Sequence, residues 1–375
     1  MFDRHIICVV GARPNFMKMA PILRALSSNL PTTPVLLVHT GQHYDREMSD
    51  QLFDDLKLPR PDINLEVGSA THAVQTAEVM QKFEPVLDAY KPYCVIVVGD
   101  VNSTLACTLV AVKKNIPVAH VEAGLRSYDR KMPEEINRIL TDQIADRLYT
   151  TERSAEINLN NEGIASDRIC FVGNVMIDSL LHSRKSTLQV SDILSSYNIN
   201  PVIVDKFKKY GVVTLHRPSN VDDPIELCNF LNILIDVSKK IPLIFTLHPR
   251  TKNNIKKFQL NYIFDCESII FLPPQGYLEM LSLLSKSTLI LTDSGGLQEE
   301  STALGIPCLT LRENTERPIT VNQGTNTVVG CNRKIILECV NQILIGKGKS
   351  GLIPEYWDGY AANRISVDLK EWLCI

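Results

Sequence analysis

Ionisable side chains come directly after apolar runs at several places in this 375-residue chain. A single carboxylate or histidine in such a position is more often structural, for example as a helix cap. A set is more informative, because neighbouring ionisable groups shift one another's pKa values and can divide the roles of general acid and general base. Such a set predicts an acid–base site. Its members are Asp100, Glu122, His216 with Arg217, and His248 with Arg250.

A further pair of carboxylates, Glu134 and Glu135, follows Pro133 at the expected start of a helix, and Arg138 comes one turn later. Acidic residues in a first helical turn are favourable for the helix dipole alone. Close to the carboxylates at the strand ends, they can also take part in proton transfer. The sequence leaves both interpretations of this pair open.

The run GARPNFMK follows the first apolar run and predicts a tight turn into a helix. Gly11 permits the turn, and Pro14 fits the first turn of a helix. Free backbone N–H groups at a helix start attract anions, and Arg13 and Lys18 add positive charge at the same place. The run is not GxGxxG, so it does not support a dinucleotide site of the NAD type.

The run TDSGGLQEE repeats the order of strand, glycine turn and helix. Ser294 can cap the helix, while Gly295 and Gly296 let an oxyanion approach the backbone. Glu300 lies in the following helix, where it can accept hydrogen bonds from ribose hydroxyls. Arg317 follows the next strand and is expected at the same edge. A capped helix with acidic early turns is the simpler interpretation, but two glycines after a buried strand favour phosphate binding.

The elements that must position these groups are short apolar strands alternating with amphipathic helices. The strands, such as CVIVV at 94–98, are continuously apolar, which is typical of parallel sheets covered on both faces. Strands separated by helices indicate right-handed βαβ units. In the first half we expect strands at 5–10, 35–39, 94–98, 117–121, 147–150 and 169–172, and helices at 14–28, 72–90, 102–114 and 133–146.

The polar, Ser-rich stretch 178–210 is expected to connect two domains, after which the alternation restarts. The chain is also too long for one ordinary core. We therefore expect an α/β protein with two Rossmann-like domains, 1–175 and 176–359, and a ligand cleft between their sheets, while 360–375 packs back on the first domain. The second half has expected strands at 211–215, 242–247, 269–272, 288–292 and 307–311, and helices at 224–239, 275–285, 296–304, 334–345 and 360–373.

Composition excludes several other classes of protein. A net charge of −3 gives no basic surplus for nucleic acid, so we expect no such partner. The ten cysteines form no CxxC and have no zinc spacing, which favours reduced thiols and no metal site. No apolar run approaches the roughly 20 residues that span a bilayer, and no secretory leader is evident. We expect a cytoplasmic protein without a membrane partner.

Taken in order, these segments resemble the non-hydrolysing UDP-N-acetylglucosamine 2-epimerases. The matching segments are GARPNFMKMAPI, HTGQHYD, VGDVNSTLA, HVEAGLRS, MPEEINR, VGNVMID, TLHRPSN, TDSGGLQEE and TERP. The resemblance covers nearly the whole chain, and the nine segments together are specific for the family. It implies the glycosyltransferase-B architecture of two facing Rossmann-like domains, a homodimer, and no NAD or metal. The implied reaction inverts C2 between UDP-GlcNAc and UDP-ManNAc, through elimination of UDP to 2-acetamidoglucal and re-addition.

Site residues follow from the resemblance position by position. Asp100 and Glu134 are the leading candidates for proton transfer, Glu122 is a second carboxylate near C2, and Lys18 and His216 stabilise the leaving group. The implied UDP-binding residues are Arg13, His216, Met280, Ser294, Gly295, Gly296, Glu300 and Arg317, with Met280 near the uracil. Further cleft candidates are Gln42, His43, Arg138 and His248.

The chain also departs from the family pattern. The first loop reads RPN where many members read RPE, and Gln42-His43 is followed by an insertion, Tyr44-Asp45. Glu78 replaces an arginine of the members that bind a second UDP-GlcNAc as activator, which argues against such activation here. Alternatives to the epimerase are a hydrolysing relative that releases ManNAc and UDP, a 2-epimerase of a modified UDP-HexNAc, a glycosyltransferase of the same fold, and a non-catalytic UDP-sugar sensor.

Overall fold

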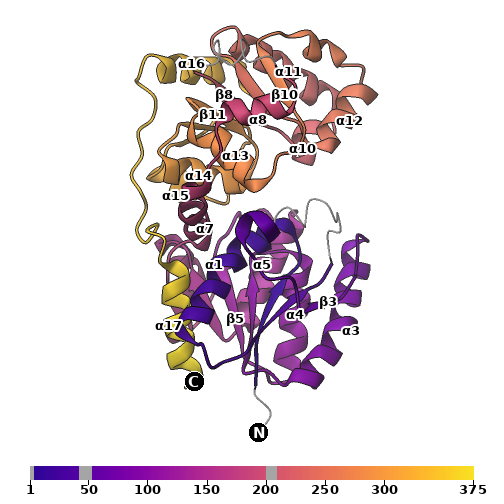
Figure 1. Ribbon diagram of the computed structural model, residues 1–375, viewed down its shortest axis with the longest axis vertical. Coiled ribbons are helices and arrows are strands. Elements are labelled where there is room, and N and C mark those ends of the chain that lie inside the picture. Colours follow the sequence, from indigo (N-terminus) through magenta and orange to yellow (C-terminus); the bar gives the residue numbers. More distant parts are fainter. Residues whose placement is uncertain (1–3, 42–52, 200–208) are drawn as a thin grey trace. The chain divides into compact units, whose positions relative to one another are not determined.

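The chain forms two compact units, shown in Figure 1. The computed structural model describes residues 4–41, 53–199 and 209–375. The first unit consists of Met1–His182 with Glu355–Ile375, and the second of Ser183–Pro354.

The first unit extends past residue 175, where the sequence placed the boundary, because helix α7 (Val175–Ser183) belongs to it. Asp178 of α7 accepts hydrogen bonds from the backbone N–H groups of Ala361 (3.2 Å) and Ala362 (2.7 Å), at the start of the last helix, α17 (Ala361–Leu373). α17 also packs against α1 (Arg13–Asn29). The last helix is therefore part of the first unit.

The first unit is built on a parallel sheet with strand order β3-β2-β1-β4-β5-β6-β7. The central strands β1, β4 and β5 are buried along their whole length, as their continuous apolar runs predict. The strands are β1 (Ile6–Val10), β2 (Val35–His39), β3 (Ile63–Asn64), β4 (Cys94–Val98), β5 (Val118–Ala123), β6 (Arg147–Thr150) and β7 (Ile169–Phe171).

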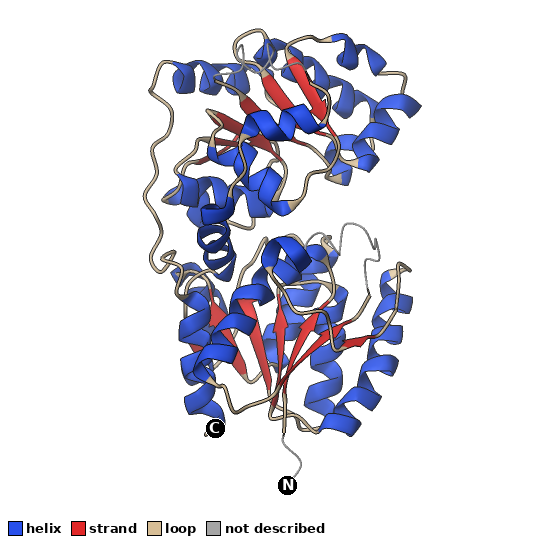
Figure 2. Ribbon diagram, in the orientation of Figure 1, coloured by secondary structure: helices blue, strands red, loops and turns tan. Residues whose placement is uncertain are grey.

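Two groups of helices cover this sheet: α1 packs with α17, and α4 packs with both α3 and α5. The strand order reverses between β1 and β4, and right-handed crossovers on the two sides of a reversal place their helices on opposite faces. Figure 2 shows helices around the sheet. The remaining helix bounds are α3 (His72–Tyr90), α4 (Asn102–Lys113), α5 (Pro133–Ile144) and α6 (Arg153–Asn161).

The second unit repeats the plan with a parallel sheet of strand order β10-β9-β8-β11-β12-β13. Its strands are β8 (Gly211–Thr214), β9 (Leu243–Thr246), β10 (Ile269–Leu272), β11 (Leu289–Thr292), β12 (Cys308–Thr310) and β13 (Asn326–Val328). Its helices are α8 (Val190–Ser196), α10 (Pro218–Val221), α11 (Pro224–Ser238), α12 (Pro249–Lys257), α13 (Tyr277–Ser285), α14 (Gly295–Leu304), α15 (Pro318–Asn322) and α16 (Arg333–Leu344).

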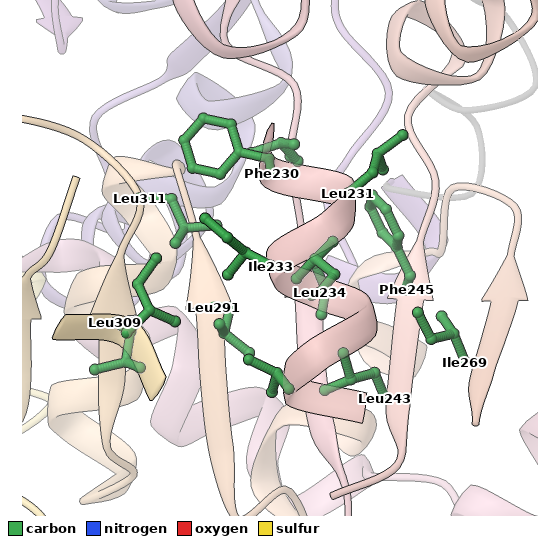
Figure 3. Packing of buried hydrophobic residues seen from close by; sticks show 14 of the residues in the cluster. Phe230, Leu231, Ile233, Leu234, Leu243, Phe245, Ile269, Leu291, Leu309 and Leu311 are labelled. Atoms are coloured by element: carbon green, nitrogen blue, oxygen red, sulfur yellow. The ribbon is translucent and has the colours of Figure 1, made fainter. Parts of the chain in front are cut away.

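The core of the second unit lies between α11 and its sheet. Figure 3 shows Ile233 and Leu234 of α11 over the strands that carry Leu243 and Leu291. All four side chains are almost fully buried. Burial of apolar surface of this kind stabilises by about 25 cal/mol per Å², so this layer holds the sheet, and with it the strand ends, in place.

Parts of the stretch expected to be an irregular connection are helical: it contains α8 and most of α7. The sequence did not predict the short strand β13, because only three of its residues pair with β12. Tertiary contacts stabilise it, since the Asn326 side chain accepts a hydrogen bond from Thr310 Oγ1 (2.6 Å) and donates one to Gln298 (3.1 Å). None of the helices in the described parts of the chain is long and apolar enough to cross a membrane.

Each sheet has one point where the strand order reverses, between β1 and β4 in the first unit and between β8 and β11 in the second. Open parallel sheets bind ligands outside the carboxyl ends of their strands at such a point. The predicted site residues Asp100 and His216 follow β4 and β8. The topology thus places them where each unit is expected to hold a ligand.

Candidate active site

A buried ion pair joins Lys18 to Glu122 in the first unit. Lys18 Nζ lies 2.7 Å from both carboxylate oxygens of Glu122, and the two residues are 6% and 3% exposed. Lys18 comes from the second turn of α1 and Glu122 from the carboxyl end of β5. Burial of two charges is tolerated only when they are paired, so each group fixes the other.

The backbone at Glu122 is shaped to direct its side chain. Glu122 has a φ of 71°, in the left-handed region, and the register of β5 against β6 shifts between Val121 and Ala123. Such bulges redirect side chains next to active sites, and the strained backbone has an energetic cost. Gly99, the residue after β4, makes room for the pair, since a Cβ at Gly99 would lie 2.9 Å from Lys18 Nζ.

Asp100 forms an ion pair with Arg138 of α5, through Oδ2 and Nη1. The Asp100 side chain is 24% exposed, whereas Arg138 is buried. Arg138 also donates to Glu135 through Nε (2.9 Å) and Nη2 (2.6 Å). Burial alone would raise the pKa of Glu135, but hydrogen bonds from the Ser127 backbone and from Arg138 outweigh it and lower that pKa. Arg138 therefore bridges a structural carboxylate and one that reaches solvent.

The two carboxylates that open α5 differ in their surroundings. Glu135 is buried in the interactions with Arg138 and the Ser127–Tyr128 backbone. Glu134 is half-buried, and its side chain makes no hydrogen bond or ion pair with any residue that the structure describes. The structure thus separates the pair: Glu135 supports Arg138, and Glu134 remains available for a ligand.

The start of α1 differs from the expectation of an open anion site. The side chain of Asn15 accepts hydrogen bonds from the backbone N–H groups of Gly11 (3.1 Å) and Ala12 (2.9 Å), and it donates to Val98 O (3.0 Å). The N–H groups of Gly11 and Ala12 are therefore not free, because a side chain of the following helix caps them. Arg13 is the first residue of α1.

In the second unit, His216 is held by Asp293, a residue that the sequence did not single out. His216 Nδ1 lies 3.0 Å from Asp293 Oδ1. Asp293 is fully buried and also accepts from the backbone N–H groups of His216 (2.9 Å) and Arg217 (2.8 Å), and from Asn220 Nδ2 (3.1 Å). Its position could have identified it from the sequence, because Asp293 is an acidic residue at the end of the buried strand β11, as Asp100 is at the end of β4.

Asp293→Asn is expected to lower the free energy of unfolding at pH 7 by about 1–3 kcal/mol, because buried donors lose an ionised acceptor. Burial alone would raise the pKa of Asp293, but hydrogen bonds and charge from His216 and the Arg217 backbone lower it. A lowered pKa stabilises the fold above the unfolded value of about 4, and the contribution is lost as the pH falls below it.

Urea unfolding of both proteins at several pH values tests this prediction. The difference between wild type and variant should narrow as the pH falls below about 4. A difference that stays constant well below pH 4, with no narrowing, would contradict an ionised Asp293.

The glycine turn before α14 holds a carboxylate of the protein itself. A Cβ at Gly295 would lie 2.7 Å from Glu316 Oε1. Glu316 forms ion pairs with Arg312 (2.8 Å) and Arg217 (3.5 Å). Burial would raise its pKa, but the charges of Arg317 and Arg312 lower it to about 2. The turn therefore lies beside an anionic side chain of the protein, and phosphate binding at Gly295 and Gly296 stays a prediction. Ser294 occupies the N-cap position, but its side chain does not cap the helix, so that expectation is wrong.

The other predicted UDP-binding residues lie around α14. Arg317 is buried at the start of α15 and pairs with Glu299 through Nε (2.9 Å). Glu300 is buried beside Tyr277, whose pKa is raised by burial and then by the charge of Glu300. Met280 of α13 is half-buried against the core. Gly296 is the second residue of α14.

His248 caps α12 by accepting a hydrogen bond at Nδ1 from the Arg250 backbone (3.1 Å). Its ring lies 5.5 Å from that of His216. Burial, together with His216, lowers the pKa of His248. His248 thus has a structural role beside His216. Gln42 and His43 lie outside the described residues, as does the Tyr44-Asp45 insertion.

Known proteins are similar to this chain in both sequence and fold. The UDP-N-acetylglucosamine 2-epimerase family model matches residues 27–370. A UDP-N-acetylglucosamine 2-epimerase of Methanocaldococcus jannaschii is 42% identical over 95% of this chain and 96% of the relative. A UDP-2,3-diacetamido-2,3-dideoxy-D-glucuronate 2-epimerase of Pseudomonas aeruginosa is 39% identical over 96% of this chain and 98% of the relative.

The crystal structure of the M. jannaschii UDP-GlcNAc 2-epimerase in complex with UDP-GlcNAc and UDP matches with a TM-score of 0.84 and 39% identity, over 98% of this chain and 99% of that one. These findings confirm the expected architecture of two parallel-sheet α/β domains of the glycosyltransferase-B type and the expected kind of enzyme. The chain belongs to the UDP-N-acetylglucosamine 2-epimerase family.

Proposed function

We propose that this protein interconverts UDP-GlcNAc and UDP-ManNAc by inverting C2. The observation that carries the proposal is the grouping of Lys18–Glu122 and Asp100–Arg138 at the carboxyl ends of the adjacent strands β4 and β5. Carboxylates at one sheet edge, held in defined positions by cations, are suited to moving a proton at a sugar carbon. Family membership supports the same reaction.

The chemistry requires both acid–base groups and a site for a leaving anion. The C2 hydrogen is not acidic, so direct deprotonation is too slow. Departure of UDP breaks the C1–O bond and develops positive charge at C1, which makes the C2–H bond labile. Loss of that proton gives 2-acetamidoglucal. Re-addition of UDP at C1, with a proton delivered to the other face of C2, gives the epimer.

In this proposal the second unit binds UDP. Helix starts and cations stabilise a departing diphosphate because they offer donors and positive charge where negative charge develops. Glu300 accepts from the ribose, Arg317 grips the nucleotide, and Met280 packs near the uracil through its thioether. The groups proposed to hold the diphosphate are His216, Ser294, Gly295 and Gly296 of this unit, together with Arg13 of the first unit.

The first unit supplies proton transfer. Asp100 reaches solvent and Glu134 has no partner among the described residues, so both can meet a substrate. Lys18 and Glu122 are buried against one another, which suits a role in charge stabilisation beside C2. We further propose that the enzyme works in the cytoplasm as a homodimer without NAD or a metal. Full activity after dialysis against EDTA would support a reaction that needs neither NAD nor a metal.

A modified UDP-HexNAc is a second candidate substrate. The P. aeruginosa relative, whose name gives it a diacetamido-glucuronate substrate, is nearly as similar to this chain as the M. jannaschii relative. Turnover of both UDP-sugars by the purified protein, compared as kcat/KM, distinguishes the two substrates.

Incubation of the protein with UDP-GlcNAc in D2O tests the proposed reaction. We expect deuterium at C2 and accumulation of UDP-ManNAc, followed by proton NMR. A C2 hydrogen that is retained despite UDP binding would identify a sensor. Free ManNAc and UDP in place of UDP-ManNAc would identify a hydrolysing enzyme, in which water traps the intermediate.

A further inference from the structure

The fully buried His120 contacts residues next to the proposed proton-transfer groups, but it has no part in the reaction described above. It belongs to β5, and both nitrogens of its ring have partners. His120 Nε2 lies 2.8 Å from the backbone carbonyl oxygen of Gly99, and His120 Nδ1 lies 2.7 Å from Asp142 Oδ1.

Through its contact with Gly99, His120 touches the residue that precedes Asp100 and lies beside Lys18. Gly99 has a φ of 68°, and its N–H donates to Val121 O (3.0 Å), so the peptide turns out of β4 at this residue. Asp100 is the next residue, and Lys18 Nζ lies 2.9 Å from the position that a Cβ of Gly99 would take. The orientation of the Gly99 carbonyl therefore helps to fix the positions of both charged groups.

The contact with Asp142 extends the arrangement to Glu122. Asp142 belongs to α5, and its Oδ2 accepts from the N–H of Gly124 (3.0 Å) and pairs with Arg126 Nη1 (2.7 Å). Gly124 immediately follows the bulge that directs Glu122. The His120–Asp142 pair thus connects the carboxyl ends of β4 and β5 to α5, the helix that carries Glu134 and Arg138.

The hydrogen bonds also define the charge of the ring. A carbonyl oxygen only accepts, so Nε2 must carry a hydrogen, and a carboxylate likewise requires a hydrogen on Nδ1. Burial would raise the pKa of Asp142, but His120 and Arg126 lower it. The ion pair with Arg126 Nη1 (2.7 Å) favours the ionised carboxylate independently of the charge of the His120 ring. Arg126 is in turn paired with Glu162 through Nε (2.8 Å) and Nη2 (2.7 Å). Two cations and two anions balance within one cluster, as burial of charge demands.

We propose that His120, as a buried imidazolium held by Asp142, is a positioning residue that sets the Gly99 carbonyl and thereby aligns Asp100 and Lys18 for proton transfer at C2. The proposal rests on the proposed epimerase function. It assigns His120 no contact with the substrate.

Nitrogen-15 NMR of the histidine-labelled wild-type protein tests the charge directly. We expect the two ring nitrogens of His120, assigned by their loss in His120→Gln, to be both protonated and to have similar shifts. A neutral ring would instead give one protonated nitrogen and one bare nitrogen with widely separated shifts. That result would overturn the proposal, and because it comes from the wild type, it does not depend on the stability of a variant.

Kinetics test the positioning role. His120→Gln keeps one donor towards Gly99 but cannot bridge it to Asp142. We expect it to slow C2 deuterium exchange about 10²-fold, as small displacements of catalytic groups do, with unchanged affinity for UDP. His182→Gln, which alters an exposed histidine of the same unit, should exchange at the wild-type rate.

A second pair of variants separates position from general stability. Asp142→Asn should slow exchange as His120→Gln does. Asp146→Asn removes a carboxylate that accepts from Val118 N (2.8 Å) at the opposite end of β5, and it should leave exchange unchanged. Wild-type exchange in folded His120→Gln would refute the positioning role. A wild type without any C2 exchange would refute the epimerase function and leave the NMR result on His120 standing.

Discussion

Asp100→Asn is expected to slow C2 deuterium exchange from UDP-GlcNAc by about 10²–10⁴-fold, the range for loss of a general acid or base. An asparagine has nearly the same shape as aspartate and keeps an oxygen that can face Arg138. The substitution therefore removes the ability to take up a proton while changing the local packing little. Affinity for UDP should stay at the wild-type level, because Asp100 belongs to the unit proposed to handle the proton and not to the one proposed to hold the nucleotide.

Two further variants make this experiment specific. Glu134→Gln should show the same loss, since a second group must serve the other face of C2. Asp129→Asn alters a carboxylate in the loop before α5 that accepts from the backbone of Lys131 (3.0 Å), and it should exchange normally. Calorimetry with UDP and NMR with UDP-GlcNAc supply the two measurements. Wild-type exchange in Asp100→Asn or in Glu134→Gln would remove that residue from the catalytic set.

Lys18→Met is expected to destabilise the first unit by about 3–5 kcal/mol, because it removes the cation from a buried carboxylate. The two groups are nearly inaccessible to water, so solvent cannot replace the lost interaction. The strained backbone at Glu122 adds to the effect, since the ion pair helps to hold that conformation. C2 exchange should fall together with stability.

A double-mutant cycle isolates the contribution of the pair. Lys18→Met/Glu122→Gln should be more stable than the sum of the two single changes predicts, because the double variant buries no uncompensated charge. Hydrogen exchange of the β4 and β5 amides reports on the first unit without interference from the second. Additive losses would show that Lys18 and Glu122 do not depend on one another.

Much of the fold could be predicted from the sequence because its strands are continuous apolar runs. Strand β4 was expected at 94–98 and lies at Cys94–Val98, and helix α3 was expected at 72–90 and lies at His72–Tyr90. Parallel strands between helices leave few topologies open. Since the carboxyl ends of such strands meet at one edge, the same pattern also located Asp100 and His216.

What the sequence could not supply are contacts between distant residues. Asn15 of the Gly11 turn donates to Val98 O, 83 positions away, so the attachment of that turn to β4 has no local signature. Asp293 reaches the backbone of His216 across the sheet, 77 positions away. Both are short polar side chains that bind the end of a neighbouring strand. Which strands are neighbours depends on the strand order, and that order exists only in the folded sheet.

The membership of α17 in the first unit has a consequence for synthesis. A ribosome delivers β1 to β7 early, but Asp368, the partner of Arg147 and Tyr149, emerges only after the entire second unit. Ser366, which accepts from Asn29 Nδ2 (2.6 Å), and the buried Ile365 and Leu369 arrive equally late. The domain translated first is therefore completed last, and until then the nascent chain carries an uncovered apolar face along α1.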